Sequence, residues 1–175
     1  MLNISIEWYS SELIEHGRKI LKIANDLFTP VNTEIGGKIA GIHWWYNTAS
    51  HAPELTAGYY HTRNHNGYRD IAKMMKSVNA EFLFTCLEMY DSDLHNCGCS
   101  PEGLVSLTRS AAWSEGVHYS GENALPTGST RGYDQIVRQS KQGKGIHGFT
   151  YLRLFDWLFE SENLKRFEDF IKRMH

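Results

Sequence analysis

Side chains that could carry out acid–base or sugar chemistry lie where apolar runs of the sequence end. The clearest case is the segment 121–125, Gly-Glu-Asn-Ala-Leu, which follows the run 117–120 and precedes the breaker-rich segment 126–130. This pattern is typical of a strand that opens into a loop. It places the carboxylate of Glu122 beside the amide of Asn123, a pair suited to acid–base chemistry or to sugar binding. An acidic residue at a strand end is also often a cap or an ion-pair partner. The residues at the other strand ends are therefore needed to choose between a structural and a functional role for Glu122.

The other predicted strand ends carry further hydrogen-bonding and aromatic side chains. The candidates at all four strand ends are Lys38, His43, Trp44, Trp45, Thr85, Glu88, Glu122, Asn123 and Arg153. The glycine-rich phosphate loops GxGxxG and GxxxxGK[ST] are absent, as is the GxSxG motif of serine hydrolases. Charged and neutral hydrogen-bonding groups beside aromatic faces therefore favour a polyhydroxylated ligand.

Several of these residues also have a purely structural interpretation. Thr85 could be a core residue with a satisfied hydroxyl, and His43 could be a core histidine bonded to the backbone. One of Trp44 and Trp45 could lie in the core, because neighbouring residues of a strand face opposite sides. Arg153 and Lys38 fall on predicted buried strands, where a charge is costly unless it is paired. We therefore expect a carboxylate or a ligand to meet those two cations.

The elements that must position these groups alternate along the chain. Apolar periodicity predicts helices over residues 6–28, 67–78, 100–113, 133–142 and 163–174, and strands over residues 38–45, 81–88, 117–122 and 148–154. Strands that alternate with helices favour a parallel sheet in an α/β fold. One helix followed by four βα units is half of a (β/α)8 barrel, a fold that typically needs about 250 residues. A small open sheet with helices on both faces is the alternative, and both place functional loops at the carboxyl ends of the strands.

Composition restricts the class of protein. The chain has 175 residues with 41% hydrophobic and 22% charged residues, as expected of one globular domain spanning residues 1–175. Its net charge of −2 provides no field that would attract nucleic acid or an anionic membrane. Its apolar runs are far shorter than a membrane span. No signal peptide is recognisable at the N-terminus, so a cytoplasmic location is the default expectation.

The three cysteines are Cys86, Cys97 and Cys99, and an odd number argues against a disulfide framework. Cys97 and Cys99, with His95 nearby, could bind a metal. A structural zinc site, however, uses four ligands, usually in CxxC-type pairs. We therefore expect free thiols in a solvated loop, no metal and no cofactor.

Five segments, in this order along the chain, resemble the β-amylases of glycoside hydrolase family 14. They are GKIAGIHWWY (37–46), HAPELTAGYY (51–60), FTCLEM (84–89), GENAL (121–125) and TYLRL (150–154). The resemblance extends from about Trp8 to His175. It implies a (β/α)8 barrel that removes maltose from the non-reducing ends of α-1,4-glucans with inversion at the anomeric carbon.

The resemblance also assigns roles to residues. Glu122 falls on the family's general base, and Leu125 falls on a residue that inserts into the substrate groove. The other positions that bind the glucan correspond to Lys38, His43, Thr85, Asn123, Ala124 and Arg153. Hydrogen bonds from neighbours such as Asn123, and a nearby cation, would stabilise the Glu122 carboxylate. Thr85 could orient the attacking water or hold Glu122.

Inversion also needs a separate acid, roughly 6.5–9.5 Å from the base. In the family that acid, like the mobile lid loop, lies upstream of the helix with which this chain opens. Glu54 and Glu88 are poor substitutes, and the position of Glu88 is not that of the family's acid. We therefore expect these 175 residues to be a C-terminal half-barrel that is inactive alone. The alternatives are a glucan-binding remnant without catalysis, or a half-barrel that associates with itself or with an N-terminal half.

Overall fold

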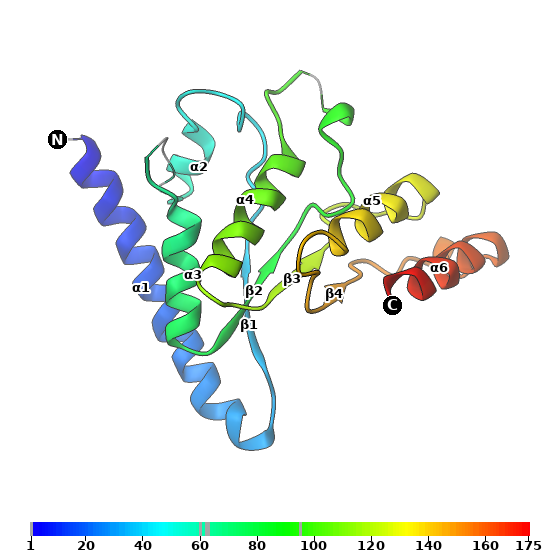
Figure 1. The fold of residues 1–175 in the computed structure, drawn as a ribbon, viewed down its shortest axis with the longest axis horizontal. Helices are drawn as coiled ribbons and strands as arrows, with labels where there is room; N and C mark the ends of the chain where they lie inside the picture. The colour runs from blue at the N-terminus through cyan, green and yellow to red at the C-terminus, as the bar shows by residue number, and fades with distance from the viewer. Residues whose placement is uncertain (1, 60, 62–63, 95) are drawn as a thin grey trace.

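Four parallel strands form the centre of the protein, in the order β1-β2-β3-β4 (Figure 1). The computed structural model describes residues 2–59, 61, 64–94 and 96–175. The strands are β1 (Ile35–Ile39), β2 (Ala80–Phe84), β3 (Tyr119–Glu122) and β4 (Phe149–Thr150). The α-helices are α1 (Leu2–Phe28), α2 (Ala52–Thr56), α3 (Gly67–Ser77), α4 (Pro101–Ser114), α5 (Thr130–Ser140) and α6 (Ser161–Met174). Short 3₁₀ turns follow α1 and precede α4 and α6, at η1 (Thr29–Val31), η2 (Asp91–Asp93) and η3 (Asp156–Phe159). One helix followed by four strand–helix units is the predicted order.

Local sequence explains where the helices begin. The hydroxyl of Ser100 accepts a hydrogen bond from Gly103 N at 3.2 Å, and Pro101 occupies the first turn of α4, as the sequence predicts. The side chain of Asn66 caps α3 and the hydroxyl of Ser129 caps α5 in the same way. Each of these caps ends a loop that follows a strand, so the loops at the carboxyl edge of the sheet are tied to helix starts.

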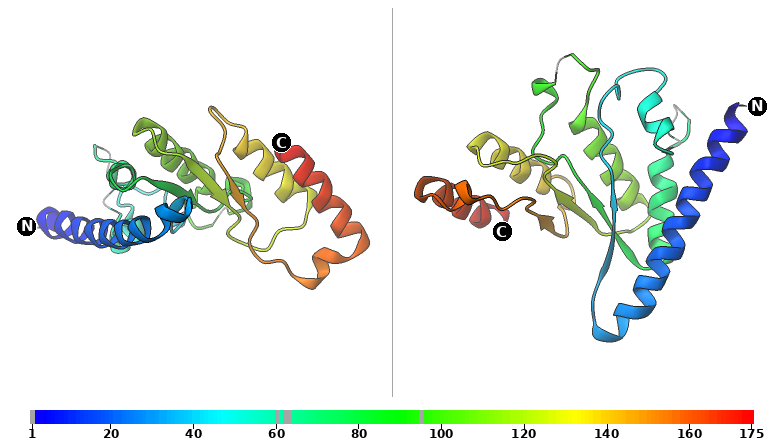
Figure 2. Two further views of the ribbon diagram at one scale, coloured as in Figure 1. Left: turned by 90° about the horizontal axis from the view of Figure 1, so that it is seen from below. Right: turned by 180° about the vertical axis from the view of Figure 1, so that it is seen from behind.

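One face of the sheet packs against the helices. A Cβ atom added to Gly37 of β1 would meet Met75 of α3 and Leu21 of α1. Phe82 and Phe84 of β2 point to the same side and are fully buried. In the view from behind in Figure 2, the strands lie in front of α4, with α3 and α1 beside them. The core therefore lies between the sheet and these helices.

The alternate residues of the strands form the other face, which no described helix covers. They are Gly36, Lys38, Glu81, Leu83, Ser120, Glu122 and Thr150, as the parallel register pairs them. A doubly covered open sheet would bury both faces. The fold is therefore the predicted half of a (β/α)8 barrel, with the inner wall of the barrel open, and not the alternative with helices on both faces.

The strand boundaries differ from the predicted ones. β1 begins at Ile35, before the predicted start, and ends at Ile39 instead of reaching Trp45. The pair Gly36-Gly37 lowered the strand propensity of the true segment. β2 ends at Phe84, because Cys86 adopts a φ of +69° that no strand accommodates. Most of the strand-end candidates therefore lie in loops at the carboxyl edge of the sheet.

β4 and the helix ends show similar shifts. β4 contains only Phe149 and Thr150 of the predicted 148–154, and Arg153 has a φ of +72°. α1 begins at Leu2, earlier than the predicted residue 6, and α5 covers Thr130–Ser140 where residues 133–142 were predicted. These shifts leave the order of elements unchanged.

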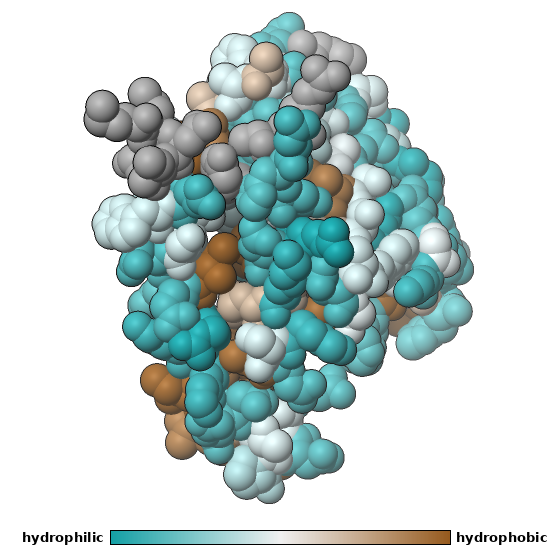
Figure 3. Space-filling view, turned by 60° about the vertical axis from the view of Figure 1, so that its left-hand side comes forward, coloured by the Kyte–Doolittle hydropathy of each residue, from teal (hydrophilic) through white to brown (hydrophobic). Residues whose placement is uncertain are grey.

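The edges of the described sheet are unpaired on one side, and the outer surface of α1 exposes apolar side chains. β1 and β4 are the edges of the sheet, and among the described residues each pairs with one neighbouring strand. Large apolar side chains on α1 are exposed, namely Trp8, Leu13, Ile20, Ile23 and Leu27. Figure 3 turns this side toward the viewer, and apolar patches lie among the hydrophilic residues. No helix within the described part of the chain is both long and apolar enough to cross a membrane.

Candidate active site

An ion pair joins two strands on the open face of the sheet. The ammonium of Lys38, on β1, contacts Oε1 of Glu122, the last residue of β3. Glu122 is buried, with 8% of its surface exposed, whereas half of the Lys38 side chain is exposed. The carboxylate expected to meet Lys38 is therefore Glu122, but the expectation that Lys38 is buried is wrong. The ammonium compensates a carboxylate charge that burial would otherwise leave unpaired.

Asn123 follows Glu122 and is completely buried. Its Nδ2 donates to the carbonyl oxygens of Leu125 at 2.9 Å and Leu152 at 3.0 Å, and its Oδ1 accepts from Leu152 N at 2.7 Å. The amide therefore joins the loop after β3 to the loop after β4. The expectation that Asn123 hydrogen-bonds to Glu122 is wrong, because all of these bonds go to the backbone.

Glu88 has a role that the sequence did not reveal. Its two carboxylate oxygens accept hydrogen bonds from Ala124 N at 3.0 Å and from Leu125 N at 2.7 Å. Burial raises the pKa of Glu88, these backbone donors oppose the rise, and the charge of Glu122 adds to it. Glu88 thus holds the loop that carries Leu125 and is fully occupied by that contact. The sequence did contain one signal of this role: Glu88 lies just past β2, and the loops that follow neighbouring strands lie at the same edge of a sheet.

Arg153 supports the same loop from the β4 side. Its Nη1 donates to the carbonyl oxygen of Ala124 at 2.7 Å. The side chain is exposed and lies beyond the strand, so the predicted burial of Arg153 is wrong and its partner is a carbonyl. Glu88, Asn123 and Arg153 together hold the backbone of Ala124 and Leu125. The side chain of Leu125 projects from this loop with 55% of its surface exposed.

Thr85 and His43 are less exposed than the rim residues. Thr85 is buried, with 8% of its surface exposed, as a core residue would be. Nδ1 of His43 is buried and has no hydrogen-bond partner among the described residues. Burial lowers the pKa of His43, and the charge of Asp91 partly opposes this. Burial therefore favours the neutral form of His43, whose buried Nδ1 has no partner among the described residues.

Trp44 and Trp45 lie in the turn that follows His43, and both are exposed. The expectation that one of them is a core residue is wrong, because β1 has already ended and Trp45 adopts a φ of +57°. The two indoles line an open groove of about 570 Å³ with Thr48, Ser50, Ala52, Pro53 and Thr56. Aromatic faces beside hydroxyl groups suit a sugar ring.

Glu54 is not available to a ligand. It is completely buried, and its carboxylate contacts Nδ1 of His51 at 2.8 Å and the hydroxyl of Tyr68. Glu54 lies in the first turn of α2, the helix that follows the loop from β1. This observation agrees with the low expectation that Glu54 serves as an acid.

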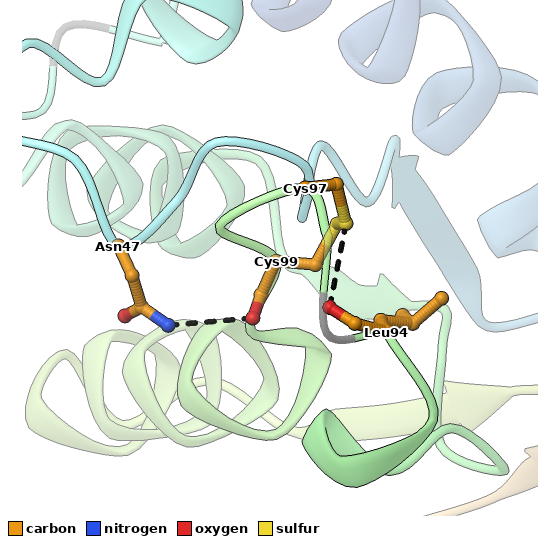
Figure 4. The surroundings of a disulfide bond; sticks show 4 residues. All are labelled: Asn47, Leu94, Cys97 and Cys99. Atoms are coloured by element: carbon orange, nitrogen blue, oxygen red, sulfur yellow. Dashed lines mark hydrogen bonds between the residues drawn. A yellow bond between two sulfur atoms is a disulfide. The ribbon is translucent and has the colours of Figure 1, made fainter.

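Cys97 and Cys99 form a disulfide (Figure 4), so the expectation of free thiols is wrong. Gly98 adopts a φ of +55° between them and folds the chain so that their Cα atoms are 5.1 Å apart, which a disulfide can bridge. His95, the possible third metal ligand, lies outside the described residues. Within the described residues, no group of three or more His, Cys, Asp or Glu side chains is arranged to hold a metal.

Known proteins share this sequence and fold. The chain is 45% identical to chloroplastic beta-amylase 2 of Arabidopsis thaliana and 43% identical to a beta-amylase of Zea mays, over 97% of its own length in each case. It covers 33% and 37% of those two proteins, so it spans about a third of the length of these curated relatives. The catalytic domain of a beta-amylase from Paenibacillus polymyxa matches with a TM-score of 0.81 at 33% identity, over 95% of this chain and 40% of that chain.

The match to the family itself covers almost the whole chain. The sequence profile of glycosyl hydrolase family 14 aligns with residues 3–175, which include Glu122, Glu88 and the loop that they flank. The half-barrel fold and the relatives agree with that match. The chain therefore belongs to glycosyl hydrolase family 14.

Proposed function

We propose that residues 1–175 form, as a single domain, the C-terminal half of a β-amylase-type barrel. The complete barrel hydrolyses α-1,4-glucosidic bonds of starch-like glucans from the non-reducing end and releases maltose with inversion. The observation that carries this proposal is the buried Glu122 carboxylate on the open inner face, paired with Lys38 and flanked by the supported loop 123–125. The family membership supports the same substrate class.

In this proposal Glu122 is the general base. It accepts a proton from a water molecule, whose oxygen attacks the anomeric carbon from the side opposite the leaving glucan. A second carboxyl group protonates the departing oxygen. Glu54 and Glu88 are each committed to other hydrogen bonds, so we assign the acid to the upstream half of the barrel.

Lys38, His43, Thr85, Asn123, Ala124, Leu125 and Arg153 are the proposed glucan-binding positions. The structure supports different kinds of contribution among them. Lys38, Leu125 and Arg153 are exposed and can touch a sugar directly. Asn123 has its side chain fully occupied by Leu125 and Leu152, so we propose that it acts by shaping the loop.

The partner of this half-barrel is proposed to be the upstream half. Both sheet edges, β1 and β4, can pair with further strands, and unpaired edges favour association. The apolar side chains exposed on α1 lie beside the β1 edge and would be covered in a closed barrel. Self-association of this chain is the alternative, and sedimentation tests it. A well-folded monomer would count against self-association through these edges.

Two assays test the function. We expect the 175-residue chain alone to release no maltose from soluble starch, and we expect maltotriose to bind in calorimetric titration. Maltose release that Glu122→Gln abolishes would show that the chain already contains its acid. Binding without turnover is also what a non-catalytic glucan-binding remnant would show, and adding the upstream half of the barrel separates the two. Absence of any binding would contradict the proposed site.

A further inference from the structure

The disulfide loop 97–99 lies against the turn that carries His43, Trp44 and Trp45. Trp45 N donates a hydrogen bond to Cys97 O at 2.8 Å, and Asn47 N donates to Gly98 O at 2.8 Å. The side chain of Asn47 adds a bond from Nδ2 to Cys99 O at 3.3 Å, which Figure 4 shows. The carbonyls of three consecutive residues therefore accept hydrogen bonds from one turn.

The next residue continues this contact. Ser100 N donates to His43 O at 3.0 Å, and Ser100 also caps α4. The turn 43–47 is thus fixed to the start of α4 through the four residues 97–100. A change in the shape of residues 97–99 must move the acceptors that hold Trp45 and Asn47.

These contacts hold the turn, together with a hydrogen bond from the hydroxyl of Thr48 to Trp45 O at 2.6 Å. Trp45 has a φ of +57°, a left-handed conformation that costs a bulky residue about 1 kcal/mol. Such a conformation persists only where its surroundings impose it. The indole of Trp45 is 51% exposed, so core packing does not supply that constraint.

The surroundings of the two sulfur atoms also suit the reduced state, in which Cys97 and Cys99 are thiols. Cys97 is partly exposed and Cys99 is buried. Sγ of Cys97 lies 3.6 Å from Leu94 O. A disulfide sulfur has no proton to donate to that oxygen, but a thiol has one. The third cysteine, Cys86, is a buried free thiol, so a reductant has no bond to break there, and burial raises its pKa to about 12, which disfavours the reactive thiolate.

We propose that the Cys97–Cys99 disulfide is a reducible clasp that positions the turn 43–47 and thereby sets the affinity of the glucan site. The inference rests on the proposed function and names a regulation of that site, since His43 is a proposed glucan ligand and the two indoles line the neighbouring groove. Cys97 and Cys99 are positioning residues, because they act through the turn.

The redox step involves a dithiol reductant. One thiolate attacks Sγ of Cys97, the S–S bond breaks, and Cys99 leaves as a thiolate and takes up a proton. The second thiolate of the reductant then attacks the reductant sulfur that is bonded to Cys97. The bond to Sγ of Cys97 breaks, and Cys97 leaves as a thiolate and takes up a proton. The protein gains two electrons and two protons, and the dithiol is oxidised to a cyclic disulfide.

Amide hydrogen exchange on the 175-residue chain, with and without dithiothreitol, tests the clasp directly. We expect reduction to speed the exchange of the Trp45 and Asn47 amides by about tenfold, as the weakening of one hydrogen bond implies. The double variant Cys97→Ser/Cys99→Ser should exchange like the reduced protein and ignore the reductant. The control Cys86→Ala keeps the bridge and should respond like the unmodified chain. Equal exchange of both amides in the oxidised and reduced chains would overturn the clasp.

Maltotriose titration of the same samples tests the coupling. We expect reduction to weaken binding by about fivefold, the low end of coupling between a local change and a binding site. Faster exchange with unchanged affinity would overturn the proposed regulation. Absence of maltotriose binding in both redox states would overturn the proposed function instead. The amide exchange rates would still test whether the disulfide positions the turn 43–47.

Discussion

Replacing Glu88 by glutamine should destabilise the protein by loosening the loop beside Glu122. Glutamine keeps one oxygen, so only one of the N–H groups of Ala124 and Leu125 retains its acceptor. The other N–H faces the NH₂ group of the new side chain, which is also a donor. The loop should therefore become less ordered although the size of residue 88 is unchanged.

The magnitude follows from these contacts. A buried donor left without an acceptor costs about 1–3 kcal/mol, and a neutral acceptor in place of a carboxylate weakens the remaining bond by roughly 1 kcal/mol. Ala124 is partly exposed, so water can satisfy its N–H and the lower end of the first range applies. Burial disfavours the ionised form of Glu88, and glutamine avoids that cost. We expect a net loss of about 1.5 kcal/mol, which lowers Tm by roughly 4 °C in a chain of this length.

The raised pKa of Glu88 fixes the direction in which its contribution to stability changes with pH. The pKa of Glu88 is raised above its ordinary value of 4.5, so the folded protein holds this proton more tightly than the unfolded chain. Stability contributed by Glu88 is therefore largest below pH 4.5 and declines as the pH rises through the raised pKa. The difference in unfolding free energy between the original chain and Glu88→Gln should shrink between pH 4.5 and neutrality.

Urea denaturation of the two chains at pH 4.5 and pH 7 measures both effects. Glu168→Gln is the matched control, because Glu168 is exposed on α6 and should change stability by less than about 0.5 kcal/mol. If Glu88→Gln unfolds at the same urea concentration as this control at both pH values, the hydrogen bonds to Ala124 and Leu125 do not hold the loop.

Three further perturbations follow from the site. Lys38→Met leaves the buried Glu122 carboxylate unpaired; we expect a loss of about 1 kcal/mol in urea unfolding, modest because Lys38 is half exposed, and an unchanged midpoint would show that the ion pair contributes nothing. Asn123→Ala removes an amide that joins two loops; we expect a loss of about 2 kcal/mol and faster amide exchange at Leu152, and intact protection of Leu152 would refute that role. The pKa of His43 is lowered by burial, so the folded state binds its proton less tightly, and stability should fall as the pH drops below about 6.5; an NMR titration of His43 at or above 6.5 would contradict this.

The order of the elements was predictable because local chemistry sets it. The Ser100 cap and Pro101 give α4 its start, and the apolar periodicity of α3 and α6 gives their extent. The ends of the strands were not predictable from propensity. Cys86, Trp45 and Arg153 adopt left-handed conformations that their side chains do not favour, so tertiary contacts impose them.

The candidate site shows the same division. The position of Glu122 at a strand end could be predicted from the sequence, and its role as the base is what the resemblance to the family implies. Its pairing with Lys38 could not, because it depends on the register that brings two non-adjacent strands onto one face. The hydrogen bonds from Ala124 N and Leu125 N to Glu88 likewise depend on the position of a neighbouring loop. The disulfide between Cys97 and Cys99 depends on the left-handed conformation of Gly98.

Reconstitution of the barrel tests the central claim most directly. The 175-residue chain is mixed with a polypeptide that contains the four upstream βα units of a family member, and release of β-maltose from soluble starch is followed by NMR. We predict release only from the mixture, with the β-anomer as the first product, and none when the chain carries Glu122→Gln. Release by a mixture containing Glu122→Gln at the original rate would contradict the assignment of Glu122 as the base.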